Sequence, residues 1–176
     1  MKKALLIIAN NGFQDWEYYY PRNTLENEGF DIDIASSQKW TCKGKLDEIS
    51  AEANKTLNEV NLEEYEMIVF VWGPWVPNEF DNDENYIKIF ENSINANKTV
   101  WAICIAPTVL SKSSYFNWKK VTWFDAGKWE QIETIKNNWG NYTWEDVEVD
   151  QNFVTAIWPN AAEEFANKLV EVHKSY

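Results

Sequence analysis

Apolar residues form short runs that alternate with amphipathic segments along the chain. Most of these runs are continuous, which is typical of strands that are covered on both faces of a sheet. The run at residues 30–35 instead alternates apolar and acidic positions, and it predicts an edge-like strand. The strands expected from these patterns lie at residues 4–9, 30–35, 67–71, 99–103, around Val121 and at 153–157.

Helices are expected between these strands. Pro21 is expected to open a helix that ends near Gly29, because proline suits the first turn of a helix and glycine suits the position after its last turn. Apolar residues recur at helical spacing over residues 86–94, and a last helix is expected with Pro159 in its first turn. The apolar stripe of that last helix consists of Ala162, Phe165, Ala166, Leu169, Val170 and His173.

Alternation of buried strands with helices predicts an α/β fold with a doubly wound, mostly parallel sheet sandwiched by helices. Residues 38–60 are irregular, with a hairpin expected at residues 43–49. The 176 residues contain no internal repeat and no linker-like segment, so we expect a single domain over residues 1–176.

Composition and charge narrow the functional class. The formal charge of −12 repels phosphate backbones, so nucleic-acid binding is not expected. The longest apolar stretch, residues 67–76, is too short to span a membrane and contains Gly73 and Pro74. Two cysteines that are far apart in the sequence indicate a reducing compartment, and a cytoplasmic location is expected. Of these, Cys42 is expected to be an exposed loop thiol.

Cys104 is the candidate nucleophile. It follows the strand at residues 99–103, and Pro107 indicates that a helix begins immediately afterwards. A side chain on such a strand-to-helix turn is exposed as in a nucleophile elbow, and the helix N-terminus lowers the pKa of a thiol. The alternative is a buried structural thiol. One histidine, two cysteines without ligand spacing and isolated glycines predict neither a metal site nor a cofactor-binding loop.

Four segments carry a resemblance to a known family. Residues 102–107, Ala-Ile-Cys-Ile-Ala-Pro, resemble the cysteine elbow of the DJ-1/PfpI (ThiJ) family, a branch of the class I glutamine amidotransferase-like superfamily with a flavodoxin-like fold. Residues 9–17 resemble the loop that carries the acid of that family. Residues 65–71 resemble its central strand, and residues 160–166 its last helix.

The resemblance implies a site. Cys104 would be the reactive cysteine, and Glu17 the carboxylic acid that hydrogen-bonds its sulfur. The N–H groups of Gly73 and Ile105 would form an oxyanion-binding corner, where fixed amides stabilise developing charge. Taken without the resemblance, Glu17 would be read as a solvated loop carboxylate.

The chain also departs from the family pattern. Protease-like members carry histidine directly after the cysteine, where this chain has Ile105. Others place a histidine on a later loop, where this chain has Phe124 and Asp125. The one histidine, His173, belongs to the expected last helix, so no cysteine–histidine triad can be assembled within one chain and peptidase activity is disfavoured.

The function implied by the resemblance is cofactor-independent attack on small reactive dicarbonyls, as in glyoxalases and deglycases. The resemblance also implies a homodimer. The alternative is a non-enzymatic oxidative-stress sensor or chaperone that uses an oxidisable Cys104. A third possibility is a tryptophan-lined ligand-binding module.

Tryptophan is over-represented and glycine is scarce. The chain has 11 Trp and 6 Gly, whereas average usage would give roughly 12 Gly. The tryptophans would fill an aromatic core, form a stacking surface, or result from decoding of UGA as tryptophan where the source organism reads glycine. The third explanation rests on six tryptophans at turns where the family carries glycine, namely Trp40, Trp72, Trp75, Trp118, Trp144 and Trp158.

Overall fold

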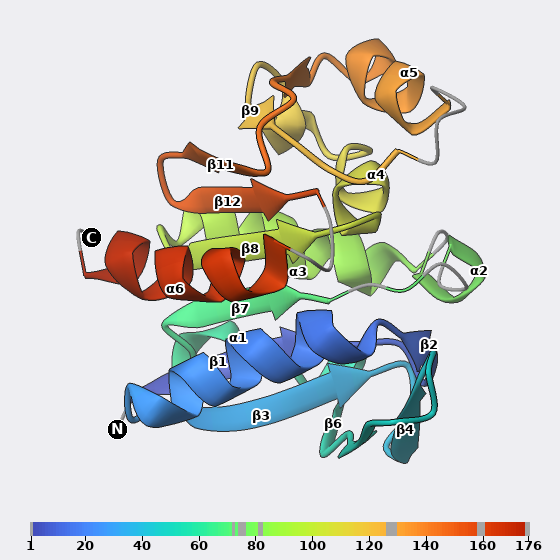
Figure 1. The fold of residues 1–176 in the computed structure, drawn as a ribbon, viewed down its shortest axis with the longest axis vertical. Coiled ribbons are helices and arrows are strands. Elements are labelled where there is room, and N and C mark those ends of the chain that lie inside the picture. The colour runs from blue at the N-terminus through green and yellow to red at the C-terminus, as the bar shows by residue number, and fades with distance from the viewer. Residues whose placement is uncertain are drawn as a thin grey trace.

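The protein forms a three-layer α/β sandwich, with a central sheet between two layers of helices (Figure 1). The computed structural model describes residues 2–71, 73, 77–80, 83–125, 130–157 and 161–174. The strands of the central sheet are β1 (Lys3–Ile7), β3 (Asp31–Ser36), β6 (Lys55–Thr56), β7 (Met67–Phe70), β8 (Thr99–Ile103), β11 (Val147–Asp150) and β12 (Phe153–Ala156). The helices are α1 (Asp15–Asn27), α2 (Pro77–Phe80), α3 (Glu84–Asn95), α4 (Ala106–Leu110), α5 (Glu130–Asn137) and α6 (Ala162–His173).

The strand order of the central sheet is β11-β12-β8-β7-β1-β3-β6. All neighbouring strands are parallel except β11, which runs antiparallel to β12. The predicted doubly wound, mostly parallel sheet is therefore confirmed. Every residue of β7 and β8 is buried, which explains why these strands are continuous apolar runs in the sequence.

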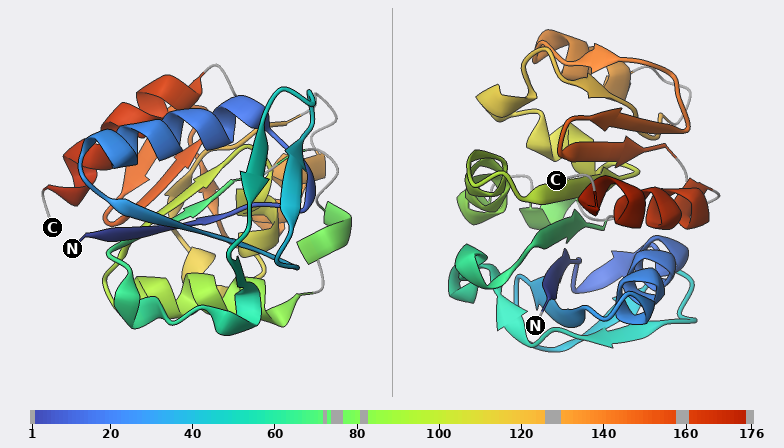
Figure 2. Two further views of the ribbon diagram at one scale, coloured as in Figure 1. Left: turned by 90° about the horizontal axis from the view of Figure 1, so that it is seen from below. Right: turned by 90° about the vertical axis from the view of Figure 1, so that its left-hand side faces the viewer.

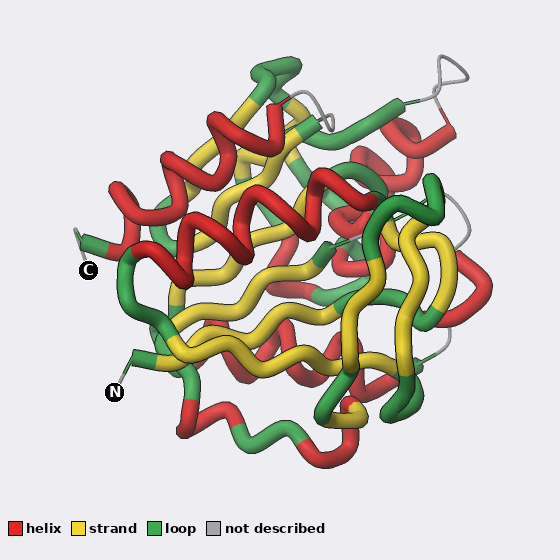
Figure 3. The backbone as a smooth tube through the Cα atoms, turned by 60° about the horizontal axis from the view of Figure 1, so that its bottom comes forward, coloured by secondary structure: helices red, strands yellow, loops and turns green. Residues whose placement is uncertain are grey.

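Helices cover both faces of the sheet. Helices α1 and α6 lie side by side on one face, whereas α3 covers the other (Figures 2 and 3). Aromatic side chains join the sheet to the helices on both faces. On the face covered by α6, Trp101 of β8 packs against Phe165, and on the face covered by α3, Phe70 of β7 packs against Tyr86. In α6, the buried stripe includes Val172 in place of the expected Val170.

Helix α1 begins six residues earlier than expected. The Gln14 side chain caps it by accepting hydrogen bonds from the backbone N–H groups of Trp16 and Glu17. The expectation that Pro21 opens this helix was wrong, because Pro21 lies inside it and only removes one internal hydrogen bond. The consequence matters for the site, since Glu17 belongs to the first turn of a helix and not to a loop.

A buried carboxylate joins three segments at the amino-terminal side of the sheet. Asp33 accepts hydrogen bonds from Tyr65 Oη (2.7 Å), Asn54 Nδ2 (2.6 Å) and Lys3 Nζ (3.0 Å). Burial alone would raise the pKa of Asp33, but these three hydrogen bonds outweigh it and the pKa is lowered.

Two small sheets flank the main one. The first contains β2 (Asn11–Phe13), β4 (Thr41–Gly44) and β5 (Ser50–Glu52), and β4 with β5 forms the hairpin expected near residues 43–49. The second pairs β9 (Lys120–Val121) with β10 (Asn141–Tyr142), so the strand expected around Val121 lies outside the central sheet. Short 3-10 turns occur at Leu57–Glu59, Leu62–Glu64 and Ser114–Phe116.

Cys42 is a buried residue of β4, and the expectation of an exposed loop thiol was wrong. Alternate residues of β4 face inward, so Cys42 and Gly44 are buried while Thr41 and Lys43 are exposed. Burial raises the pKa of the Cys42 thiol. Within the described parts of the chain, none of the helices has both the length and the apolar character that a membrane span requires.

Candidate active site

Cys104 lies at the carboxyl edge of the sheet, directly after β8 and two residues before α4. Its φ is 62°, in the left-handed region that side chains other than glycine rarely adopt. The backbone is held there from both sides, because the Cys104 N–H donates to the Ala156 carbonyl (2.9 Å) and the Phe124 N–H donates to the Cys104 carbonyl (3.1 Å). This is the strained strand-to-helix turn that the sequence predicts.

Glu17 lies against this cysteine. Its side chain is fully buried, and it lies close enough to the Cys104 thiol to raise the pKa of that thiol. The contact depends on the early start of α1, since the Gln14 cap fixes the first turn that carries Glu17. The structure therefore brings together the two side chains that the sequence analysis singled out.

The environment of the thiol differs from the expectation. Cys104 is only 6% exposed, and burial followed by the neighbouring Glu17 raises its pKa well above the ordinary value. The Ile105 N–H, which donates to the sulfur, and the charge of Lys45 act in the opposite direction but are outweighed. The expectation of a partly exposed, low-pKa thiol was wrong, because α4 is a short helix and a buried carboxyl group faces the sulfur.

Ile105 and Gly73, the two residues expected to supply oxyanion-binding amides, lie in different surroundings from each other. The Ile105 N–H is directed at the cysteine sulfur. Gly73 is buried, and a Cβ at this position would overlap the carbonyl oxygen of Gly12. Only glycine fits such a close approach of two chain segments. Trp72, Trp75 and Trp158 lie outside the described residues.

Asp15 is a part of the site that sequence reasoning missed. This fully buried carboxylate accepts hydrogen bonds from the backbone N–H groups of Leu46 (2.9 Å) and Ile49 (3.0 Å). A Cβ on Gly44 would overlap the Asp15 carboxylate, so the hairpin end packs tightly onto the first turn of α1. Lys45, whose charge acts on Cys104, belongs to this anchored segment. No local pattern in the sequence signals it, because the contact joins segments some thirty residues apart.

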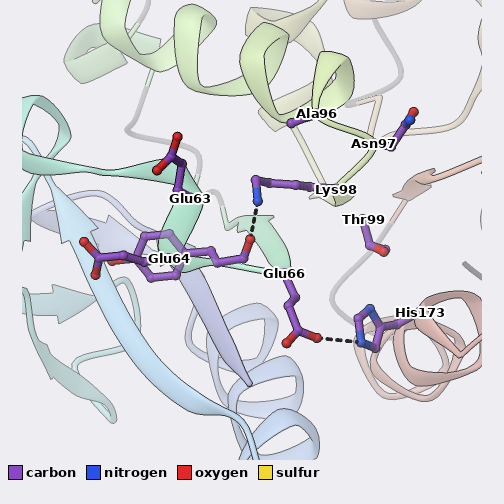
Figure 4. Close-up of a pocket in the computed structure, with 9 residues that line it drawn as sticks. Glu63, Glu64, Glu66, Ala96, Asn97, Lys98, Thr99 and His173 are labelled. Atoms are coloured by element: carbon purple, nitrogen blue, oxygen red, sulfur yellow. Dashed lines mark hydrogen bonds and ion pairs between the residues drawn. The ribbon is translucent and has the colours of Figure 1, made fainter. Parts of the chain in front are cut away.

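The loop on which some family members carry a histidine does reach the cysteine in this chain, through the hydrogen bond from the Phe124 N–H to the Cys104 carbonyl. It brings Phe124 and Asp125 there, neither of which can act as a histidine base. His173 lies at the opposite edge of the sheet, 3.2 Å from Glu66 (Figure 4). Its ring is also in edge contact with the Phe30 ring. It is a packed residue at the end of α6.

A surface hollow lies at a distance from Cys104 and Glu17. A cavity of about 450 Å³ lies near the starts of β7 and β8, where Lys98 Nζ donates to the Tyr65 carbonyl and His173 pairs with Glu66 (Figure 4). No cysteine is among the residues that line it. The buried cysteine is therefore a better candidate for the active site than the cavity, because reactivity depends on the thiol and its acid and not on the volume of a hollow. The described residues contain no group of three or more His, Cys, Asp or Glu side chains that could hold a metal ion.

Comparisons with known proteins identify the family of the chain. The DJ-1/PfpI family matches residues 2–172 of the chain. An uncharacterized protein of Methanocaldococcus jannaschii is 34% identical over 170 residues, covering 96% of this chain and 81% of that protein. A deglycase of Pyrococcus horikoshii is 30% identical over 159 residues, covering 89% and 90% of the two chains. The crystal structure of a ThiJ/PfpI domain protein from Brachyspira murdochii superimposes with a TM-score of 0.90 at 24% identity, covering 99% and 97%. This chain therefore belongs to the DJ-1/PfpI family.

Proposed function

We propose that the protein is a cysteine-dependent enzyme that acts on small reactive dicarbonyls without a cofactor, in the manner of a glyoxalase or deglycase. The observation that carries this proposal is the buried contact between Glu17 and Cys104 on a strained turn. An acid and a thiol isolated from water can pass a proton between them and a bound carbonyl compound. A relative that is named a deglycase supports the same class of chemistry.

The proposed reaction converts methylglyoxal and water to lactate. The Cys104 sulfur adds to the aldehyde carbon, and the thiol proton passes through the Glu17 carboxylate to the new oxygen, which gives a hemithioacetal and leaves Glu17 ionised. Glu17 then removes the proton from that carbon and returns it to the neighbouring carbon, while the hydroxyl proton moves from the first oxygen to the second, so a thioester forms with no net change in electrons. Water hydrolyses the thioester to lactate and restores the thiol.

Two backbone positions are proposed to support this reaction. The Ile105 N–H is directed at sulfur in the free protein, where it favours the thiolate. We propose that it turns to the oxyanion when the sulfur forms its bond to carbon, together with the N–H of Gly73. The absence of a Cβ on Gly73 is required by its close approach to the Gly12 carbonyl.

The test measures lactate formation from methylglyoxal by the wild-type protein, Cys104→Ala and Glu17→Gln. Loss of activity in both variants is expected, because one lacks the nucleophile and the other lacks the proton carrier. Cys42→Ala is the matched control, since it removes the other buried thiol from a different sheet and should keep activity. Equal lactate release by wild type and Cys104→Ala would refute cysteine dependence, and no release by folded wild type would refute the dicarbonyl substrate.

A second candidate function is oxidation sensing, because the acid beside the sulfur would stabilise a sulfinate once it has formed. Two equivalents of peroxide would oxidise the Cys104 thiol to a sulfinate with release of two water molecules, and a protonated Glu17 would donate a hydrogen bond to it. Mass spectrometry after peroxide treatment separates the two functions. Formation of a stable sulfinate by wild type but not by Glu17→Gln, without lactate release, would favour the sensor.

The homodimer and the cytoplasmic location remain predictions that accompany this proposal. Light scattering on the purified chain tests the first, with a mass of one protomer as the contrary result. The two free, buried thiols support a reducing compartment.

A further inference from the structure

The residues of this protein that adopt the left-handed backbone conformation include several bulky side chains. Among the residues that the structure describes, seven other than glycine have a positive φ, and three of these are tryptophan. The φ angles of Trp118, Trp139 and Trp144 are 66°, 63° and 68°. Bulky side chains are outliers in this region, which glycine adopts without strain. Each of the three indole side chains is also more than half exposed to solvent, which is the reverse of what an apolar ring favours.

Trp139 occupies a defined position at the end of α5. The Gly140 N–H donates to the Ile135 carbonyl (2.9 Å), and the Trp139 N–H donates to the Lys136 carbonyl (3.1 Å). This pair of hydrogen bonds defines a Schellman motif, whose left-handed residue is usually glycine and sometimes asparagine. Trp139 is that left-handed residue.

The same chain provides two internal comparisons, because α1 and α3 end in the same motif. The left-handed position holds Gly29 (φ 82°) after α1 and Asn97 (φ 53°) after α3. The paired hydrogen bonds run from Phe30 to Leu25 and from Gly29 to Glu26 in the first case, and from Lys98 to Ser93 and from Asn97 to Ile94 in the second. Two of the three motifs therefore obey the residue preference, and the third carries the largest side chain available.

Trp118 and Trp144 lie in turns with comparable backbone. The Trp118 N–H donates to the Trp139 carbonyl (2.8 Å), so two left-handed residues lie side by side with ring centroids 5.6 Å apart. Trp144 follows β10 directly after Thr143, whose N–H donates to the Val121 carbonyl (3.0 Å). None of these backbone hydrogen bonds requires a side chain.

We propose that Trp118, Trp139 and Trp144 are glycine in the protein that the source cell makes, because its ribosomes read the codon UGA as glycine. Composition supports this assignment, since 11 Trp accompany only 6 Gly in 176 residues. Trp118 and Trp144 coincide with positions where the family resemblance implies glycine, whereas Trp139 is assigned from the backbone alone. Trp40 is not included, because its φ lies outside the left-handed region.

The competing explanation is a genuine aromatic surface. Trp118 and Trp139 form a ring pair, and such a pair would serve a tryptophan-lined ligand-binding module. The two explanations make opposite predictions, because a selected aromatic pair should stabilise the fold and an artefactual pair should strain it.

The first test reads the codons of the gene at positions 118, 139 and 144. TGA at all three supports the proposal, and TGG at any one of them overturns it for that residue. The mass of the peptide that contains position 139, from protein isolated from the source cells, gives an independent answer, with glycine expected and tryptophan contradicting the proposal.

The second test is thermal unfolding of the chain as translated. Trp139→Gly should raise Tm by about 1–4 °C, because relief of the left-handed strain exceeds the extra entropy of an unfolded glycine. Trp139→Asn should give a smaller rise, and Trp139→Ala should give none, since its Cβ keeps the strain. Trp40→Gly is the matched control, because Trp40 is equally exposed but has ordinary backbone, and its Tm should not rise. A fall in Tm for Trp139→Gly as large as that for Trp40→Gly would overturn the proposal.

Discussion

Replacement of Cys104 by glycine should give a more stable protein than replacement by alanine, which reverses the usual order of the two residues. Cys104 has a φ of 62°, and its neighbours hold the backbone there through two hydrogen bonds. Both variants lose the sulfur and its contact with Glu17. The difference between them therefore isolates the cost of a Cβ atom on left-handed backbone.

The magnitude follows from two opposing contributions. A residue with a Cβ in the left-handed region costs about 1–2 kcal/mol relative to right-handed backbone. Glycine loses more conformational entropy on folding than alanine, and this costs roughly 0.5–1 kcal/mol. The Cys104→Gly variant should therefore exceed Cys104→Ala by roughly 0.5–1 kcal/mol, or about 1–4 °C in Tm for a chain of this size.

Chemical and thermal unfolding of the two variants measures this difference, and the same pair of substitutions at Cys42 is the control. Cys42 is also a free, buried cysteine, but it lies in β4 with ordinary strand backbone. There, glycine should be less stable than alanine. If glycine is less stable than alanine at both positions by the same amount, the turn at Cys104 stores no strain, and the argument for a strained nucleophile is refuted.

Three further predictions test the surroundings of the site and the sheet. Gly73→Ala should lower stability by about 1–3 kcal/mol in urea unfolding and abolish lactate release, because a Cβ overlaps the neighbouring chain; unchanged stability would contradict the close approach. Lys45→Met should shift the pH profile of thiol labelling at Cys104 upward, because the lysine charge lowers the pKa of the thiol. The shift should shrink at high salt, and Lys43→Met, an exposed control on the same hairpin, should produce none. The pKa of Asp33 is lowered in the folded state, so its contribution to stability is present above the unfolded pKa of about 4 and is lost as the pH falls through the folded value. Unfolding of Asp33→Asn between pH 5 and about 2 should show less dependence on pH than the wild type, and parallel curves would contradict the network.

Those parts of the fold that depend on local hydrophobic pattern could be predicted from the sequence. The strand at residues 99–103 has the bounds that the apolar run indicates, and residues 86–94 lie within α3. The start of α1 could not be predicted in this way, because Pro21 is a strong local signal for a first turn and the Gln14 cap is a weak one. The edge strand β11 was also missed. Its sequence, Val-Glu-Val-Asp, alternates apolar and acidic residues, but the run is only four residues long and all four residues are half-buried.

The same distinction explains what could be predicted of the candidate site. The cysteine turn is a local feature, and a strand followed closely by proline is enough to suggest it. The acidity of Cys104 is not local, because it depends on how deeply Glu17 and Cys104 are buried against each other after the sheet and α1 pack. A helix N-terminus favours a thiolate, but burial of the sulfur opposes it most strongly and the facing Glu17 carboxylate opposes it next, so the pKa of Cys104 is raised.

This reversal changes how the site should work. Because the Glu17 carboxylate opposes ionisation of Cys104, the thiolate forms only when Glu17 takes up the proton, and the pair then carries one negative charge in total. Transfer of that proton to Glu17 as sulfur attacks a carbonyl leaves a neutral acid beside the new bond. A thiol that is inert until its own acid accepts the proton avoids oxidation at rest. The buried, high-pKa cysteine therefore favours catalysis over oxidation sensing.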